Sequence, residues 1–169
     1  MAALSASRNT PEWSGSRRQH YGLLGVEAST NIYVGGMVAI DASGYAVPAS
    51  AVATLKVLGI CESVYAGGTM PPGVNALNQT GNGSLYPGAT GVLGAAGAIS
   101  VGVVRGVFGM DHDGSVVATV IGSLVYALDD HTVSTSTGAG ANPVAGTLIA
   151  IDAGLAYVDF FAQSAIAAA

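Results

Sequence analysis

Short runs rich in valine, isoleucine and tyrosine recur along the chain, and glycine residues separate them. No window keeps the apolar period of about 3.6 residues that marks an amphipathic helix, and the best helical candidates, 49–55 and 163–169, are both short. Many short strands with turn signals favour an all-β protein, either a small β-barrel or a β-sandwich of the jelly-roll type. The expected strands are residues 32–34, 37–40, 45–47, 56–64, 99–109, 116–120, 124–128, 148–151 and 156–161.

One pattern occurs three times, at residues 36–41, 122–129 and 146–152. Each copy is a glycine, a short apolar strand and then an aspartate, and a second short strand follows. An aspartate side chain can accept hydrogen bonds from backbone amides two residues further on, which suits a tight turn. The pattern therefore predicts three β-hairpins, each with an aspartate at its turn.

Charged residues are scarce. They make up 9% of the chain, against about 25% in an ordinary soluble domain, while 50% of the residues are hydrophobic. The formal net charge of -5 argues against a general nucleic-acid-binding protein, which needs a basic face. No apolar run reaches the roughly 20 residues of a membrane-spanning helix, and the first 30 residues do not resemble a secretory signal. We therefore expect a protein made in a cytoplasm, with much of its surface covered by other protein chains.

The chain divides by composition into an arm, a body and a tail. Residues 1–20 form an extended N-terminal arm with three of the five basic residues and the single tryptophan. Residues 21–162 form the β-rich body, which contains a long central loop at 66–91, and 163–169 form a C-terminal tail. The loop has apolar residues but no charges, so we expect it to lie on a neighbouring chain.

No cluster of residues predicts an active site, a metal site or a cofactor. The run from Asp111 to Gly114 begins like a calcium-binding loop but lacks the acidic residues that must follow, so we interpret it as a solvated turn. Asp129, Asp130 and His131 are interpreted as turn residues. Cys61 lies in an apolar run and is expected to be buried and unreactive. With one cysteine, the chain can form no internal disulfide bond.

Residues 121–160 resemble the C-terminal half of the small capsid decoration (cement) proteins of tailed bacteriophages. The resemblance rests on a Gly-x-x-Val-Tyr strand, a turn with aspartates, and a closing glycine, apolar strand, glycine turn and Val-x-Phe pattern. Residues 36–41 and 103–108 resemble the opening and middle strands of that family.

This resemblance implies a non-enzymatic, β-rich virion protein. Such a protein binds the outside of an icosahedral capsid as a homo-oligomer, with a trimer favoured over a dimer, and bridges neighbouring capsomers. Its partners are the major capsid protein and further copies of itself, without nucleic acid, membrane or cofactor. We expect the arm and the loop to contact the capsid, because aromatic and arginine side chains are preferred interface anchors. The candidate capsid-binding residues are Arg8, Trp13, Arg17, Arg18, Tyr65, Met70, Leu77, Leu85 and Tyr86.

Two other functions fit the sequence. The chain could be another virion component, such as the base of a head fibre or a tail protein, which would share the composition. It could also be a small β-barrel enzyme or a β-barrel module that binds glycans, either of which would need a pocket with convergent polar groups.

Overall fold

The computed structural model describes residues 3–15, 17–66 and 95–161, apart from the side chains of residues 65 and 66. These residues form two five-stranded β units and two short 3-10 turns, η2 (Ala118–Val120) and η3 (Gly138–Gly140). The prediction of an all-β protein is confirmed. Residues 49–55 are irregular rather than helical, and 163–169 lie outside the described residues. Within the described part of the chain, no helix has the length and apolarity needed to cross a membrane.

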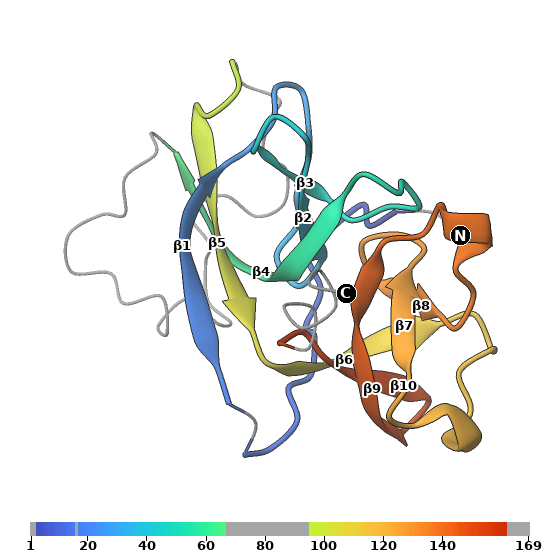
Figure 1. The fold of residues 1–169 in the computed structure, drawn as a ribbon. Coiled ribbons are helices and arrows are strands. Elements are labelled where there is room, and N and C mark those ends of the chain that lie inside the picture. Colours follow the sequence, from blue (N-terminus) through green and yellow to red (C-terminus); the bar gives the residue numbers. More distant parts are fainter. Residues whose placement is uncertain (1–2, 16, 67–94, 162–169) are drawn as a thin grey trace.

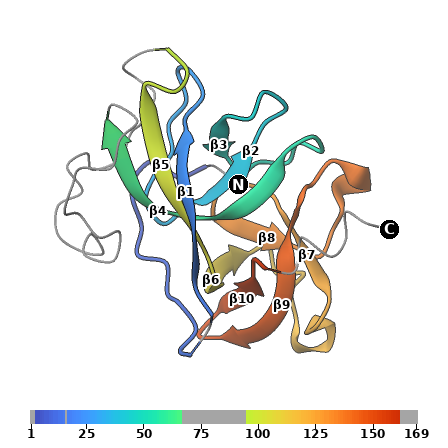
Figure 2. The same ribbon diagram turned by 60° about the vertical axis from the view of Figure 1, so that its left-hand side comes forward.

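The N-terminal half of the body is an antiparallel sheet, here called the open sheet (Figures 1 and 2). Its two outer strands approach each other at one end, where Val26 and Ala46 form an isolated parallel bridge. The sheet is therefore strongly curved. In spatial order its strands are β1 (Gln19–Gly25), β5 (Ile99–Arg105), β4 (Lys56–Ala66), β2 (Met37–Ile40) and β3 (Ala46–Pro48).

The C-terminal half is a small closed barrel, on the right in Figure 1. Four of its five strand pairs are antiparallel, and β6 and β8 pair in parallel through Asp111 and Thr132. In order around the barrel the strands are β10 (Leu155–Asp159), β6 (Val107–His112), β8 (Thr132–Ser134), β7 (Leu124–Ala127) and β9 (Val144–Asp152).

The three predicted hairpins are present as the pairs β2–β3, β7–β8 and β9–β10. At the first turn, Asp41 Oδ1 accepts hydrogen bonds from the amides of Ser43 (2.9 Å) and Tyr45 (2.8 Å). Asp129 does the same for the second turn. The sequence pattern found these hairpins because the turn residue and the strands are adjacent in the chain.

Other strand predictions were wrong. Residues 32–34 are not a strand, although Ile32 is buried. Residues 116–120 are not a strand either, since 116–117 are irregular and 118–120 form η2. The predicted run 99–109 is divided between β5 and β6, with Gly106 between them. Strand β1 was not expected. Valine, isoleucine and tyrosine also occupy buried positions in segments that pair with no neighbouring strand. Composition alone therefore does not locate the hydrogen-bonded strands.

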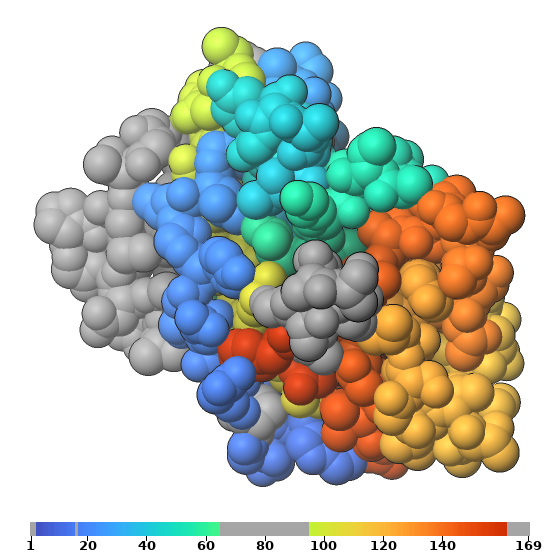
Figure 3. All heavy atoms as spheres, viewed as in Figure 1, coloured from blue at the N-terminus to red at the C-terminus, as the bar shows by residue number. Residues whose placement is uncertain are grey.

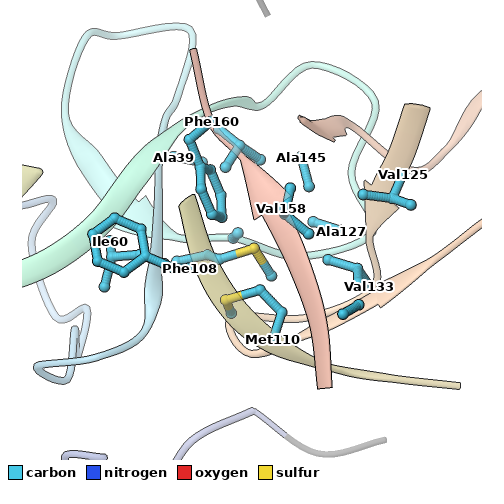
Figure 4. Packing of buried hydrophobic residues seen from close by; sticks show 14 of the residues in the cluster. Ala39, Ile60, Phe108, Met110, Val125, Ala127, Val133, Ala145, Val158 and Phe160 are labelled. Atoms are coloured by element: carbon cyan, nitrogen blue, oxygen red, sulfur yellow. The ribbon is translucent and has the colours of Figure 1, made fainter. Parts of the chain in front are cut away.

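One hydrophobic core joins the two halves of the body (Figure 4). It contains open-sheet residues such as Ala39 and Ile60 together with barrel residues such as Val125 and Val133. Phe108 and Phe160 belong to the same core, with ring centroids 6.2 Å apart. A second core covers the opposite face of the open sheet. Both faces of the central strand β4 are thus buried, which explains the apolar run at residues 57–61.

Two glycines in strands differ in how closely a neighbouring backbone approaches them. A Cβ added to Gly146 in β9 would lie 2.3 Å from the backbone oxygen of Asp159, whereas one added to Gly22 in β1 would meet nothing within 4 Å. Gly146→Ala should therefore lower the free energy of unfolding by about 1–3 kcal/mol, since neither backbone can move freely. Gly22→Ala should leave it nearly unchanged. Urea unfolding of both variants measures the difference, and equal effects would contradict the close packing of β9 on β10.

Candidate protein-interaction site

The N-terminal arm (dark blue in Figures 1 and 2) is hydrogen-bonded to the barrel. The amide of Gly109 donates to the oxygen of Pro11 (2.8 Å), and the amide of Trp13 donates to the oxygen of Val107 (2.9 Å). Strand β8 covers this edge of β6 only at its far end, at residues 111 and 112. The arm therefore completes the edge of β6 where β8 does not reach, and it acts as a short additional strand.

The same arm also contacts the turn before β2 in the open sheet. The amide of Arg8 donates to Val34 O (2.9 Å), and the hydroxyl of Thr10 donates to Gly35 O (2.6 Å). Gly35 has a positive φ of 87°, and a Cβ there would lie 2.1 Å from the backbone oxygen of Arg8. Only glycine allows this approach. The arm thus connects both halves of the body.

Two arginines of the arm pair with acidic residues of the body. Arg8 Nη1 lies 2.9 Å from Asp111 Oδ2. Arg18 contacts Glu62, whose side chain is 2% exposed, and also lies 3.2 Å from Glu12. His20 Nδ1 lies 3.0 Å from the second carboxylate oxygen of Glu62. A buried carboxylate needs such partners, so Arg18 and His20 link β1 to β4 across the intervening strand β5.

Trp13 and Arg17 face outward from the arm. Trp13 is 39% exposed and packs edge-on against Tyr157, with ring centroids 4.8 Å apart. The guanidinium of Arg17 lies over the ring of Phe161, 4.1 Å from its centroid. The aromatic rings of Tyr157 and Phe161 hold Trp13 and Arg17 in place and leave part of each side chain accessible. Such prearranged side chains suit a binding contact.

The remaining candidates cannot be placed. Met70, Leu77, Leu85 and Tyr86 lie outside the described residues. For Tyr65 the structure describes the backbone alone, at the end of β4.

The barrel has a surface that sequence reasoning did not single out. Residues 115–128 and 132–151, which include β7, β8 and all of β9 except its last residue, Asp152, contain no charged side chain. Three large apolar residues are exposed on these segments: Val117 (48%), Ile121 (48%) and Ile149 (40%). We call these two segments the neutral barrel surface, and their atoms give the orange area at the right of Figure 3. The absence of charge from two long runs was the signal in the sequence.

Hydrogen bonds bring the two segments of the neutral barrel surface together. The amide of Gly122 donates to Leu148 O (2.8 Å), and the amide of Leu148 donates to Ser123 O (2.9 Å). Ile121 and Ile149 each directly adjoin this pairing in the chain. Removing exposed aliphatic side chains from water is favourable, and in an uncharged setting no ion has to be desolvated with them. Both are properties of protein-binding surfaces.

The acidic residues at 111–113 are engaged within the chain. Asp111 pairs with Arg8. Slight burial acts to raise the pKa of Asp113, but hydrogen bonds from Ser115 and Ser134 outweigh it and lower that pKa below its ordinary value. Ser115 donates to Asp113 Oδ1 from both its hydroxyl (2.6 Å) and its amide (2.9 Å). This geometry is that of a hydrogen-bonded turn.

No family model, curated protein or solved structure matches the chain.

The Arg18–Glu62 contact can be tested by removing the cation. Among the described residues, Arg18→Met leaves the buried Glu62 with His20 as its remaining ion-pair partner, so we expect the free energy of unfolding to fall by about 3 kcal/mol. Glu12→Gln removes the more exposed acidic partner of Arg18 and should cost less than about 1 kcal/mol. Urea unfolding followed by Trp13 fluorescence measures both. Equal losses would show that the buried carboxylate does not depend on Arg18.

Cys61 offers a second test. It is 1% exposed, and burial raises the pKa of its thiol to about 12, so the reactive thiolate is not formed at neutral pH. Native protein at pH 8 should react with no thiol reagent, and protein in urea should react at its single cysteine. A chromogenic disulfide reagent measures both titres. Rapid reaction of the folded protein would place Cys61 at the surface instead.

Proposed function

We propose that this protein is a non-enzymatic virion protein that binds the outside of an icosahedral capsid as a decoration protein. The observation that carries the proposal is the neutral barrel surface, with Val117, Ile121 and Ile149 exposed on it. The resemblance of residues 121–160 to phage decoration proteins covers the same part of the chain. The expected partners are the major capsid protein and further copies of this chain, in a trimer rather than a dimer.

An uncharged surface suits this role for a physical reason. Each copy carries a formal net charge of -5, so copies packed side by side repel one another. Contact through a surface without charges avoids the cost of removing ions from water. Each oligomer would engage several capsid subunits at once, so weak individual contacts add up to stable attachment across capsomer joints.

The arm contributes to this proposal through its outward-facing residues. Trp13 and Arg17 are exposed and held in place by rings of the body, so they are available as anchors. Arg8 and Arg18 already pair with Asp111 and Glu62. Deletion of residues 1–20 would weaken the fold as well as the docking, and point substitutions at Trp13 and Arg17 are the cleaner test of capsid contact.

Copy number separates decoration from the other virion roles. Decoration of a symmetric shell requires on the order of hundreds of copies in each particle, since every equivalent position on the shell is available. A head-fibre base or tail protein would be present in tens or fewer. Quantitative mass spectrometry of purified, DNA-filled particles gives the number, and absence of the protein from such particles would overturn the proposal.

A pair of substitutions tests the surface itself. Ile121→Glu places a charge on the neutral barrel surface, so occupancy on undecorated heads should fall at least about tenfold, because the charge must be buried in the contact. Val52→Glu is the matched control, since Val52 is equally exposed (47%) but precedes β4 in the open sheet. Cosedimentation with heads measures occupancy, and light scattering measures the oligomer. Full occupancy by the Ile121 variant would contradict the role of this surface.

A further inference from the structure

The turn between β7 and β8 gathers two carboxylates and an imidazole in one place. In the described part of the chain, Asp129, Asp130 and His131 form the one group of three potential metal-binding side chains whose ligand atoms all lie within 4.8 Å of one another. His131 Nδ1 lies 3.1 Å from Asp129 Oδ1 and 3.1 Å from Asp130 Oδ1. The side chains of Asp129 and Asp130 are 8% and 3% exposed, so both carboxylates are withdrawn from water.

One oxygen of Asp129 is left without a partner. Its Oδ1 atom accepts hydrogen bonds from the amides of His131 (3.0 Å) and Thr132 (2.8 Å), which accounts for the turn. Its Oδ2 atom is buried and meets no hydrogen-bond donor among the described residues. A buried carboxylate oxygen without a donor or a cation is costly. The ion pairs that these two carboxylates make with described residues involve His131, not lysine or arginine.

The types of donor and their spacing fit one metal ion. Imidazole nitrogen and carboxylate oxygen bind Zn²⁺ at about 2.0–2.2 Å, so two such ligands of one tetrahedral ion lie about 3.3–3.6 Å apart. The 3.1 Å distances from His131 Nδ1 to Oδ1 of Asp129 and to Oδ1 of Asp130 are ion-pair distances, a few tenths of an ångström short of this spacing. Little movement would therefore be needed to bind an ion.

We propose that Asp129, Asp130 and His131 bind one divalent transition-metal ion of the Zn²⁺ class, with Asp129 Oδ2 as a ligand. Three ligands from one turn hold the ion, and the backbone amides that fix Asp129 Oδ1 keep its carboxylate in orientation. The inference does not rest on capsid binding and holds for the isolated protein.

The position of this turn gives the ion a structural role. The amide of Leu4 in the arm donates to Asp130 Oδ1 (2.9 Å), and the amide of Met37 in β2 donates to the backbone oxygen of Asp130 (2.5 Å). Asp130 is thus the point where the arm, the open sheet and the barrel meet. An ion held there stabilises the joint between all three.

The experiment uses the full-length protein after treatment with EDTA and dialysis. Calorimetric titration with Zn²⁺ should give one ion per chain. The melting temperature should rise by about 5–10 °C at free Zn²⁺ roughly one hundred times the dissociation constant. Titration with Co²⁺ gives an independent readout, because its visible absorption reports coordination by nitrogen and oxygen ligands.

The three histidines of the chain provide matched variants. His131→Gln should lower Zn²⁺ affinity at least about tenfold and abolish the Co²⁺ spectrum, while His20→Gln and His112→Gln should bind as the parent does. Asp129→Asn should weaken binding likewise. If an asparagine variant fails to fold, the Co²⁺ spectrum of the parent and the His131 variant still decide. No binding by the parent, or equal loss in His20→Gln or His112→Gln, would overturn the proposal and leave His131 as a simple partner of two carboxylates.

Discussion

The packing of Phe108 against Phe160 at the junction of the two halves is the contact on which the rest of the structure depends. β5 continues into β6 through Gly106, and the amide of Phe160 donates to Gly106 O (3.1 Å). A Cβ on Gly106 would lie 3.0 Å from the ring of Phe108, so a residue without a side chain suits the crossing. The two rings join the open sheet and the barrel in one core, and each half would otherwise expose one apolar face.

The arm reinforces this joint from outside. The arginines of the arm were predicted to contact the capsid, and for Arg8 and Arg18 the structure supplies acidic partners within the same chain. The backbone hydrogen bonds to β6 attach the arm without requiring any particular side chain. Gly35 and the ion pairs fix the register of the arm on the body. A segment with the composition of a solvated tail is thus part of the folded unit.

Local features of the fold could be predicted from the sequence, and distant contacts could not. The hairpins around Asp41 and Asp129 were found because their turn chemistry is adjacent in the chain. β1 was missed because its partner, β5, lies some eighty residues further along, and nothing in 19–25 alone indicates a strand. The burial of Asp129 and Asp130 could not be foreseen either. The same residues are exposed in most turns, and here the arm and β2 cover them.

Charge is divided unequally between the two halves of the molecule. From Gly106 to Phe161 the chain has six carboxylates and neither lysine nor arginine, while the arm and open sheet hold all five cations against four carboxylates. The six carboxylates belong to Asp111, Asp113, Asp129, Asp130, Asp152 and Asp159. Such a separation makes the folded chain a permanent electric dipole. The electric field of a charged surface rotates a dipolar molecule before the two make contact, so the molecule arrives in one preferred orientation. Dissolved salt screens the field and weakens this orientation.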